Sequence, residues 1–234
     1  MNVIRVGDAG ELASRAAALL DELIDGALRE RGRAHVALAG GTTPGGAYRL
    51  LAPTRWDGVE LWFGDERCVG PDDPQSNYRM VAETLLPIAV GASVHRIEGE
   101  LGAERAADAY DALVRARVAA GPSGVPVLDV AVLGIGEDGH TASLFPHNAA
   151  LAAAGRVAVA VHDAPKPPPE RVSLTLEALR AARACVLLAS GAGKASPLAL
   201  AMAGADPAVP SSLLERERLH IVADAAALGG AGAG

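Results

Sequence analysis

A histidine and an aspartate stand one residue apart in a glycine-rich stretch, and together they could move a proton. Asp138 and His140 belong to the segment 134–140, which also contains three glycines. A neutral imidazole accepts a proton near pH 7, so histidine is a common general base. A neighbouring carboxylate can orient the ring or favour its charged form. The spacing equally allows Asp138 to brace the loop alone, and both roles stay open.

The segment before this loop indicates where the pair lies. Residues 127–133 form an apolar run rich in valine and leucine, which is typical of a strand buried on both faces. In parallel α/β sheets, ligands bind beyond the carboxyl ends of the strands. We therefore expect Asp138 and His140 at a ligand site, and we expect other strand ends to complete it.

The loops after three other predicted strands contain groups that could bind an anion. These groups are Gly41, Thr42, Thr43, Arg67 and Lys194. The first three open a predicted helix, whose free N–H groups and positive dipole end attract anions. Taken alone, Gly41, Thr42 and Thr43 could equally form an ordinary turn. Arg67 could belong to a solvated loop with a local ion pair, and Lys194 fits a surface lysine better than a phosphate ligand. Their shared position at strand ends predicts a pocket for a phosphorylated small molecule, next to the predicted general base.

Strand and helix patterns alternate along the chain, which predicts an α/β fold. We expect a three-layer, mostly parallel Rossmann-like sheet with helices on both faces. The predicted strands are 35–39, 59–63, 94–97, 127–133, 157–161, 184–189 and 219–222. No linker or repeat divides the sequence, so we expect one domain over residues 1–234, with a frayed tail at 225–234.

Composition restricts the classes of function. The chain has 234 residues, half of them hydrophobic, and a net charge of −7. This charge leaves no basic surplus for nucleic acid, although a local positive site can still bind a small anion. No apolar run approaches the ~20 residues that span a bilayer, and residues 1–10 lack a signal-peptide pattern. We expect a cytoplasmic protein without nucleic-acid or membrane partners, as a monomer or a small homo-oligomer.

Two glycine motifs suggest a nucleotide site but do not support it. Gly134-x-Gly136-x-x-Gly139 matches a dinucleotide pattern, yet Pro146 interrupts the helix that this loop should open. Gly193-Lys194 resembles the end of a P-loop, but the first glycine of that motif is absent. The six histidines show no helical zinc-ligand spacing near an acid. We therefore expect no metal and no organic cofactor.

Five segments resemble a known family when they are read in order. They are residues 39–44, 62–67, 76–78, 133–146 and 190–194. Together they are similar to the family of 6-phosphogluconolactonases and glucosamine-6-phosphate isomerases. The resemblance implies the fold of that family, no cofactor, and a sugar-phosphate substrate. For the lactonase branch it implies hydrolysis of 6-phospho-D-glucono-1,5-lactone in the oxidative pentose phosphate pathway.

The two branches differ in the residues before Pro146. Isomerase-type members resemble Asp-Gly-His-Ile-Ala-Phe-Asn-Glu-Pro, and their glutamate serves ring opening. Here the run 138–146 has no glutamate in that place, which favours the lactonase branch. The alternative is a glucosamine-6-phosphate isomerase or deaminase with Asp65 as its base. A sugar-phosphate sensor without turnover is a second alternative.

For lactone hydrolysis, the residues and the resemblance together suggest a role for each group. His140 would remove a proton from water, and Arg67 or the glycine-rich backbone would stabilise the tetrahedral oxyanion. The phosphate would be held by Gly41, Thr42, Thr43 and Lys194, with Arg171 as a further candidate. A remote phosphate grip would orient the carbonyl for attack.

Overall fold

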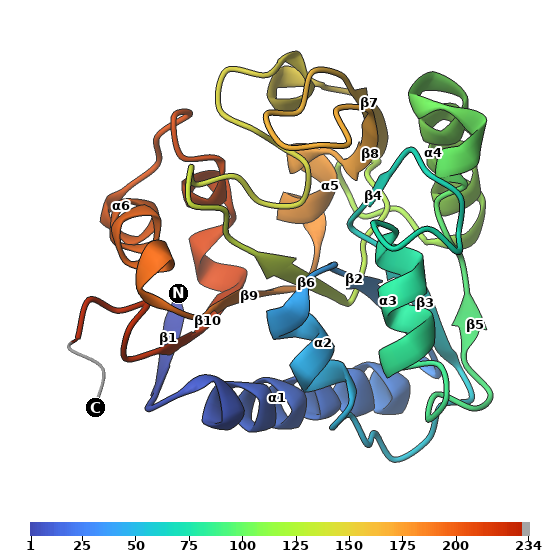
Figure 1. Ribbon diagram of the computed structural model, residues 1–234. Coiled ribbons are helices and arrows are strands. Elements are labelled where there is room, and N and C mark those ends of the chain that lie inside the picture. Colours follow the sequence, from blue (N-terminus) through green and yellow to red (C-terminus); the bar gives the residue numbers. More distant parts are fainter. Residues whose placement is uncertain (231–234) are drawn as a thin grey trace.

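Seven strands form a central sheet in which every neighbouring pair is parallel (Figure 1). The computed structural model describes residues 1–230, and the strand order is β1-β10-β9-β6-β2-β3-β5. The strands are β1 (Asn2–Val6), β2 (Ala34–Leu38), β3 (Val59–Phe63), β5 (Ser93–Val94), β6 (Val130–Gly134), β9 (Ala184–Ala189) and β10 (Leu219–Asp224). Every residue of β9 is buried, which explains why its sequence shows no polar alternation.

Six α-helices connect the strands within residues 1–230. They are α1 (Ala9–Arg31), α2 (Thr42–Tyr48), α3 (Asn77–Thr84), α4 (Ala103–Arg117), α5 (Leu176–Ala181) and α6 (Ala195–Ala203). The long helix α1 lies across one face of the sheet, and α4 and α5 lie on the other side (Figure 1). The predicted three-layer α/β fold, with a mostly parallel sheet and helices on both faces, is confirmed.

Helix boundaries follow the local signals in the sequence. The Asp8 carboxylate accepts the Glu11 N–H at 2.9 Å and begins α1, while Gly32, with φ 74°, ends it. Ser76 and Thr175 cap α3 and α5 in the same way. These caps fix where each helix starts, and therefore where the preceding loop delivers its side chains.

A second sheet contains three antiparallel strands and corrects one prediction. It is made of β4 (Asp65–Arg67), β8 (Arg171–Leu174) and β7 (Ala158–Val161), in that order. The predicted strand 157–161 exists, but as β7 it lies outside the parallel sheet. A short apolar run looks alike in either sheet, because periodicity shows burial and not the pairing partner. Helix α4 packs against β7 and β8.

The chain changes winding direction between β2 and β6. Strand β3 follows on one side of β2, whereas β6, β9 and β10 continue on the other side. Such a switch point opens a crevice beyond the carboxyl ends of the strands. The loops after β9, β6, β2 and β3 therefore come from four adjacent strands. This order brings together the strand-end groups that the sequence singled out.

The chain end differs from the expected frayed tail as far as it is described. Asp224 accepts the Ala227 N–H at 2.8 Å, and Ala227 is fully buried. Gly230 donates to the Ala225 carbonyl at 2.9 Å, so residues 225–230 form a hydrogen-bonded turn. Residues 231–234 of the predicted tail lie outside the described part. No helix within residues 1–230 is long and apolar enough to cross a membrane.

Candidate active site

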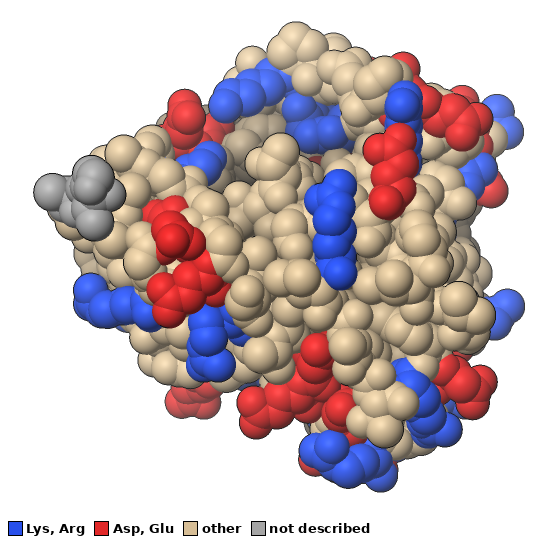
Figure 2. All heavy atoms as spheres, turned by 60° about the horizontal axis from the view of Figure 1, so that its bottom comes forward, with Lys and Arg blue, Asp and Glu red and all other residues tan. Residues whose placement is uncertain are grey.

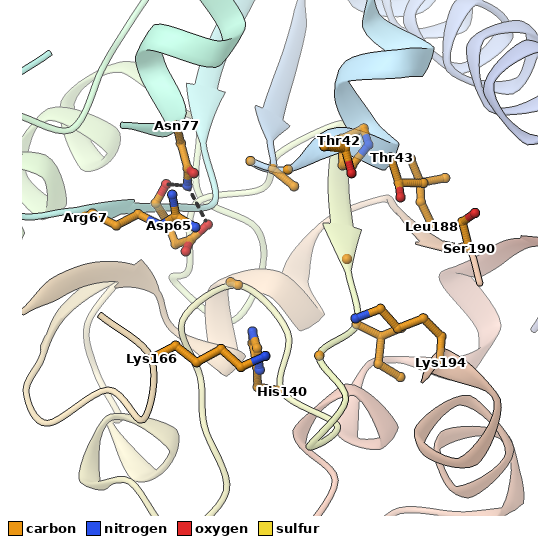
Figure 3. A pocket seen from close by; sticks show the side chains of 18 of the residues that line it. Thr42, Thr43, Asp65, Arg67, Asn77, His140, Lys166, Leu188, Ser190 and Lys194 are labelled. Carbon is orange, nitrogen blue, oxygen red and sulfur yellow. Dashed lines mark hydrogen bonds between the residues drawn. The ribbon is translucent and has the colours of Figure 1, made fainter. Parts of the chain in front are cut away.

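A pocket opens at the switch point, beyond the ends of β9, β6, β2 and β3 (Figure 3). Eight residues proposed from the sequence line it: Gly41, Thr42, Thr43, Asp65, Arg67, His140, Arg171 and Lys194. The ninth, Asp138, does not line the pocket but contacts His140, which does. Residues that are up to 153 positions apart in the chain thus share one cavity because parallel strands end at one edge.

His140 is held by Asp138 in an arrangement that suits a general base. Its Nδ1 lies 2.5 Å from Oδ1 of Asp138, which also accepts the His140 backbone N–H at 3.2 Å. Burial would raise the pKa of Asp138, but its contacts with His140 outweigh burial and lower that pKa. An ionised Asp138 only accepts hydrogen bonds, so Nδ1 carries the ring proton. The other ring nitrogen, Nε2, is then free to take a proton.

The pKa of His140 lies below the ordinary histidine value. Burial disfavours the charged ring and lowers the pKa, while Asp138 and the nearby Asp65 offset this only in part. The Phe145 ring contributes to the burial, with its centroid 4.5 Å from that of His140. A lowered pKa keeps the imidazole neutral at pH 7, and this is the form that a general base requires.

Glycines shape the loop that carries this pair. A Cβ on Gly136 would stand 2.0 Å from Nδ1 of His140 and 2.4 Å from Oδ1 of Asp138, so only glycine fits there. The Gly136 N–H donates to the His140 carbonyl at 2.8 Å and closes the turn. Gly139 has φ 81°, a conformation that glycine adopts at little cost. The glycines therefore serve the turn that presents His140.

Asp65 is a buried carboxylate with both oxygens occupied. Oδ1 accepts from Nδ2 of Asn77 at 3.1 Å, and Oδ2 accepts from the Ser143 hydroxyl at 2.6 Å. Asn77 is only 2% exposed and fits because Gly40 has no side chain, since a Cβ there would collide with the amide. These contacts join β4, α3 and the loop of His140, so Asp65 braces the pocket wall.

Positive charge is concentrated in the pocket although the protein is acidic overall. Four cations line it, Arg67, Lys166, Arg171 and Lys194, against one carboxylate, that of Asp65. None of these four cations forms an ion pair within residues 1–230. On the face that carries α1, by contrast, acidic and basic side chains are interspersed (Figure 2). The pocket is thus suited to an anionic ligand.

One corner of the pocket offers phosphate-type contacts. Backbone N–H groups of Gly41, Thr42 and Thr43 stand at the start of α2, where a helix leaves its first donors free. Lys194 reaches the same cavity from the loop after β9. That loop is fixed by Asp224, whose carboxylate accepts the Gly191 N–H at 3.0 Å. Backbone donors and an ammonium group together are a common phosphate-binding set.

Arg171 lines the pocket as proposed, but part of its guanidinium is already engaged. Its Nε donates to the Pro168 carbonyl at 3.0 Å, and its Nη2 donates to the Lys166 carbonyl at 2.8 Å. The two N–H groups of Nη1, which lies 3.5 Å from the Ser143 hydroxyl, and the second N–H of Nη2 have no other hydrogen-bond partner within residues 1–230. Any phosphate contact by Arg171 therefore depends on these terminal nitrogens.

Sequence reasoning missed three polar residues of the lining: Asn77, Lys166 and Ser190. Lys166 lies in the proline-rich segment 165–169, which the sequence predicts to be stiff and extended. This segment does not follow a predicted parallel strand, so the sequence did not place Lys166 at the pocket. Asn77 and Ser190 were present only as parts of motif segments. The three residues lie near β4, β8 or β9 in the sequence. That proximity points to the pocket only when the second sheet, which contains β4 and β8, is known.

Fold and pocket together define an α/β protein that can bind a small anion and transfer a proton beside it. Residues 7–222 match the family described as glucosamine-6-phosphate isomerases/6-phosphogluconolactonase. The chain belongs to this family, as the five sequence segments predict.

Individual relatives agree with this membership. A 6-phosphogluconolactonase of Streptomyces coelicolor is 41% identical over 83% of this chain and 80% of its own length. One of Mycobacterium tuberculosis is 38% identical, over 88% of this chain and 87% of its own. The solved 6-phosphogluconolactonase of Trypanosoma cruzi superposes with a TM-score of 0.85 at 27% identity, covering 97% and 96% of the two chains.

Proposed function

We propose that this protein hydrolyses 6-phospho-D-glucono-1,5-lactone to 6-phosphogluconate. The observation that carries the proposal is one pocket that holds both His140, whose pKa is lowered by burial, and cations that have no ion-pair partner within residues 1–230. The phosphorylated lactone needs both features, because it is an anion and an ester-like electrophile. The relatives named above carry the same activity in their names.

In the proposed mechanism, the phosphate binds first and fixes the ring. Lys194 and the start of α2 (Gly41, Thr42 and Thr43) hold the phosphate, so the carbonyl faces His140. Nε2 of His140 takes a proton from water while the water oxygen bonds to the carbonyl carbon. Arg67 faces the same pocket and donates to the resulting oxyanion. The ring C–O bond then breaks, and His140 returns its proton to the leaving ring oxygen.

The isomerase or deaminase alternative would use Asp65 as its base. Asp65 lines the pocket, and each of its oxygens accepts a hydrogen bond, one from Asn77 and one from Ser143, so its contacts are those of a residue that braces the wall. The segment before Pro146 also lacks the glutamate of that branch. Release of ammonia from glucosamine 6-phosphate by the purified protein would support the alternative over the lactonase.

We infer that the substrate is a small molecule and that the protein acts in the cytoplasm without nucleic acid, metal or organic cofactor. Within residues 1–230, no group of three or more metal-ligating side chains is found. Both cysteines of the chain are free, which agrees with a reducing compartment.

Lys194→Met tests the phosphate site. We expect KM for the phosphorylated lactone to rise by about tenfold or more, because an ammonium–phosphate contact is worth roughly 1.5–3 kcal/mol. Unphosphorylated glucono-1,5-lactone should show almost no change, since it has no phosphate to lose contact with. Initial rates are measured on both lactones with spontaneous hydrolysis subtracted. Equal effects on the two substrates would remove Lys194 from the phosphate site.

A further inference from the structure

The substrate of the proposed reaction presents negative charge at two separate points. The phosphate is charged throughout, whereas the carbonyl oxygen becomes charged only when the tetrahedral intermediate forms. Two lysines of the pocket extend from opposite sides: Lys194 from the loop after β9, and Lys166 from the segment after β7 (Figure 3). Lys194 shares its side with the start of α2. Lys166 instead extends towards the His140 ring (Figure 3).

The segment that carries Lys166 is fixed to the pocket wall. Ala164 N–H donates to the Pro169 carbonyl at 3.0 Å and closes the loop 164–169. Arg171, 5% exposed, donates to the carbonyls of Lys166 and Pro168 from inside the molecule. A lysine on such a loop keeps its backbone in place while its ammonium stays free.

The same arginine connects this loop to the general base. The Arg171 guanidinium carbon lies 5.4 Å from the centroid of the Phe145 ring, which in turn packs against His140. Arg171 therefore contacts both the loop of Lys166 and the ring that packs against His140. A change in Arg171 should disturb both together.

On the basis of the proposed function, we propose that Lys166 is a further catalytic residue, whose ammonium stabilises the oxyanion at the lactone carbonyl together with Arg67, and that Arg171 is the positioning residue that holds its loop. When water attacks, the carbonyl π electrons move to oxygen, and the ammonium of Lys166 balances that charge without giving up a proton. When the ring C–O bond breaks, the oxyanion re-forms the carbonyl and the leaving ring oxygen takes the proton from His140, which leaves a neutral carboxylic acid. This acid then loses its proton to solvent, and Lys166 faces the resulting carboxylate before release.

Lys166→Met tests the catalytic role, with Lys194→Met as a matched control. We expect kcat of Lys166→Met to fall about 100-fold, because one oxyanion donor supports a factor of about 10²–10³. KM for the phosphorylated lactone should change little, and Lys166→Arg should recover most of the rate. The control should show the opposite pattern, with KM changed more than kcat. A Lys166→Met kcat within threefold of wild type, or a loss confined to KM, would overturn the proposal.

Arg171→Lys tests the positioning role, since lysine keeps the charge but cannot bond two carbonyls in a fork. We expect a loss in kcat, and the double variant with Lys166→Met should be no slower than Lys166→Met alone. Multiplied losses, or a rise in KM restricted to the phosphorylated lactone, would show that Arg171 acts on the phosphate instead. A wild-type protein without lactonase activity would refute the proposed function itself, a result distinct from an active wild type with an unaffected Lys166→Met.

Discussion

His140 combines two opposing influences at the scale of a single residue. Burial lowers its pKa, and the Asp138 carboxylate, 2.5 Å from Nδ1, raises it, with burial the stronger. The result is a neutral ring with a fixed tautomer. A surface histidine has the same two ring nitrogens, but its tautomer is not fixed. It also becomes charged as soon as the pH falls below the ordinary histidine pKa.

The lowered pKa makes a prediction about pH. The general base must be neutral, so kcat/KM should rise with pH through the pKa of His140 and level off above it, with a midpoint below 6.5. His140→Ala should remove this limb and reduce kcat by about 10²–10⁴. A pH–rate profile on the phosphorylated lactone measures both. A midpoint well above 6.5 would contradict the assignment.

Asp138→Asn separates orientation from simple bracing of the loop. The Asp138 carboxylate raises the pKa of His140, so its removal should lower that pKa further. The rise of kcat/KM with pH should then have its midpoint at a lower pH than in the wild type. The neutral amide no longer selects the proton on Nδ1, so the plateau rate should also fall. Asp163→Asn is a suitable control, because Asp163 is exposed and asparagine tolerates its φ of 54°. An unchanged limb and plateau in Asp138→Asn would leave Asp138 only a structural role.

At the scale of single elements, two loops of the pocket need a glycine because another side chain packs directly against their backbone. The loop after β6 turns sharply enough that the ring of His140 lies against Gly136. The loop after β2 similarly allows Asn77 to lie against Gly40. In both places a functional side chain fills the space that a Cβ would need. Glycine is therefore required there by this close contact and not only by a backbone angle.

Gly136→Ala should therefore abolish most activity while the protein stays folded. The added methyl would overlap Nδ1 of His140 and Oδ1 of Asp138, and the pair must move apart. We expect kcat to fall by about the same factor as in His140→Ala, with little change in circular dichroism. Gly70→Ala is the control, because Gly70 has open space and an ordinary φ. Wild-type kcat in Gly136→Ala would show that the His140–Asp138 contact is dispensable.

Across the whole molecule, a buried ion-pair network and the candidate pocket lie at opposite ends of the parallel strands. Asp129, just before β6, accepts from Nε of Arg31 at 2.9 Å and from the His35 N–H at 2.8 Å. Arg183, next to β9, lies 3.3 Å away. This buried carboxylate joins the end of α1 to the starts of β2, β6 and β9. The candidate pocket lies at the other ends of these strands.

Asp129→Ala should lower stability without changing catalysis. The buried His35 N–H would lose its partner, which costs about 1–3 kcal/mol, and each kcal/mol lowers Tm by about 2–4 °C in a domain of this size. The kcat and KM of the folded enzyme should match wild type. Asp57→Ala provides the comparison, since its contact with Arg55 is exposed and 3.8 Å long. An unchanged Tm in Asp129→Ala would contradict the role of this network.

The sequence by itself determined most of the parallel strands and the chemistry of their ends, although it did not predict β1, β4 or β8. Burial periodicity, caps at Asp8, Ser76 and Thr175, and the uninterrupted apolar strands are local signals, so they could be read without the fold. The segments around His140 and Lys194 also predicted the family. Local patterns suffice here because the carboxyl ends of parallel strands must share an edge.

Only the tertiary structure decided which strands pair and which side chains meet. The strand at 157–161 and the unpredicted β4 joined β8 in a second sheet, since pairing depends on partners distant in the chain. That sheet brings Asp65 to Ser143, sets Arg171 under the proline-rich loop, and places Lys166 in the pocket. The loop that first suggested proton transfer thus acquired its neighbours through contacts that sequence spacing does not encode.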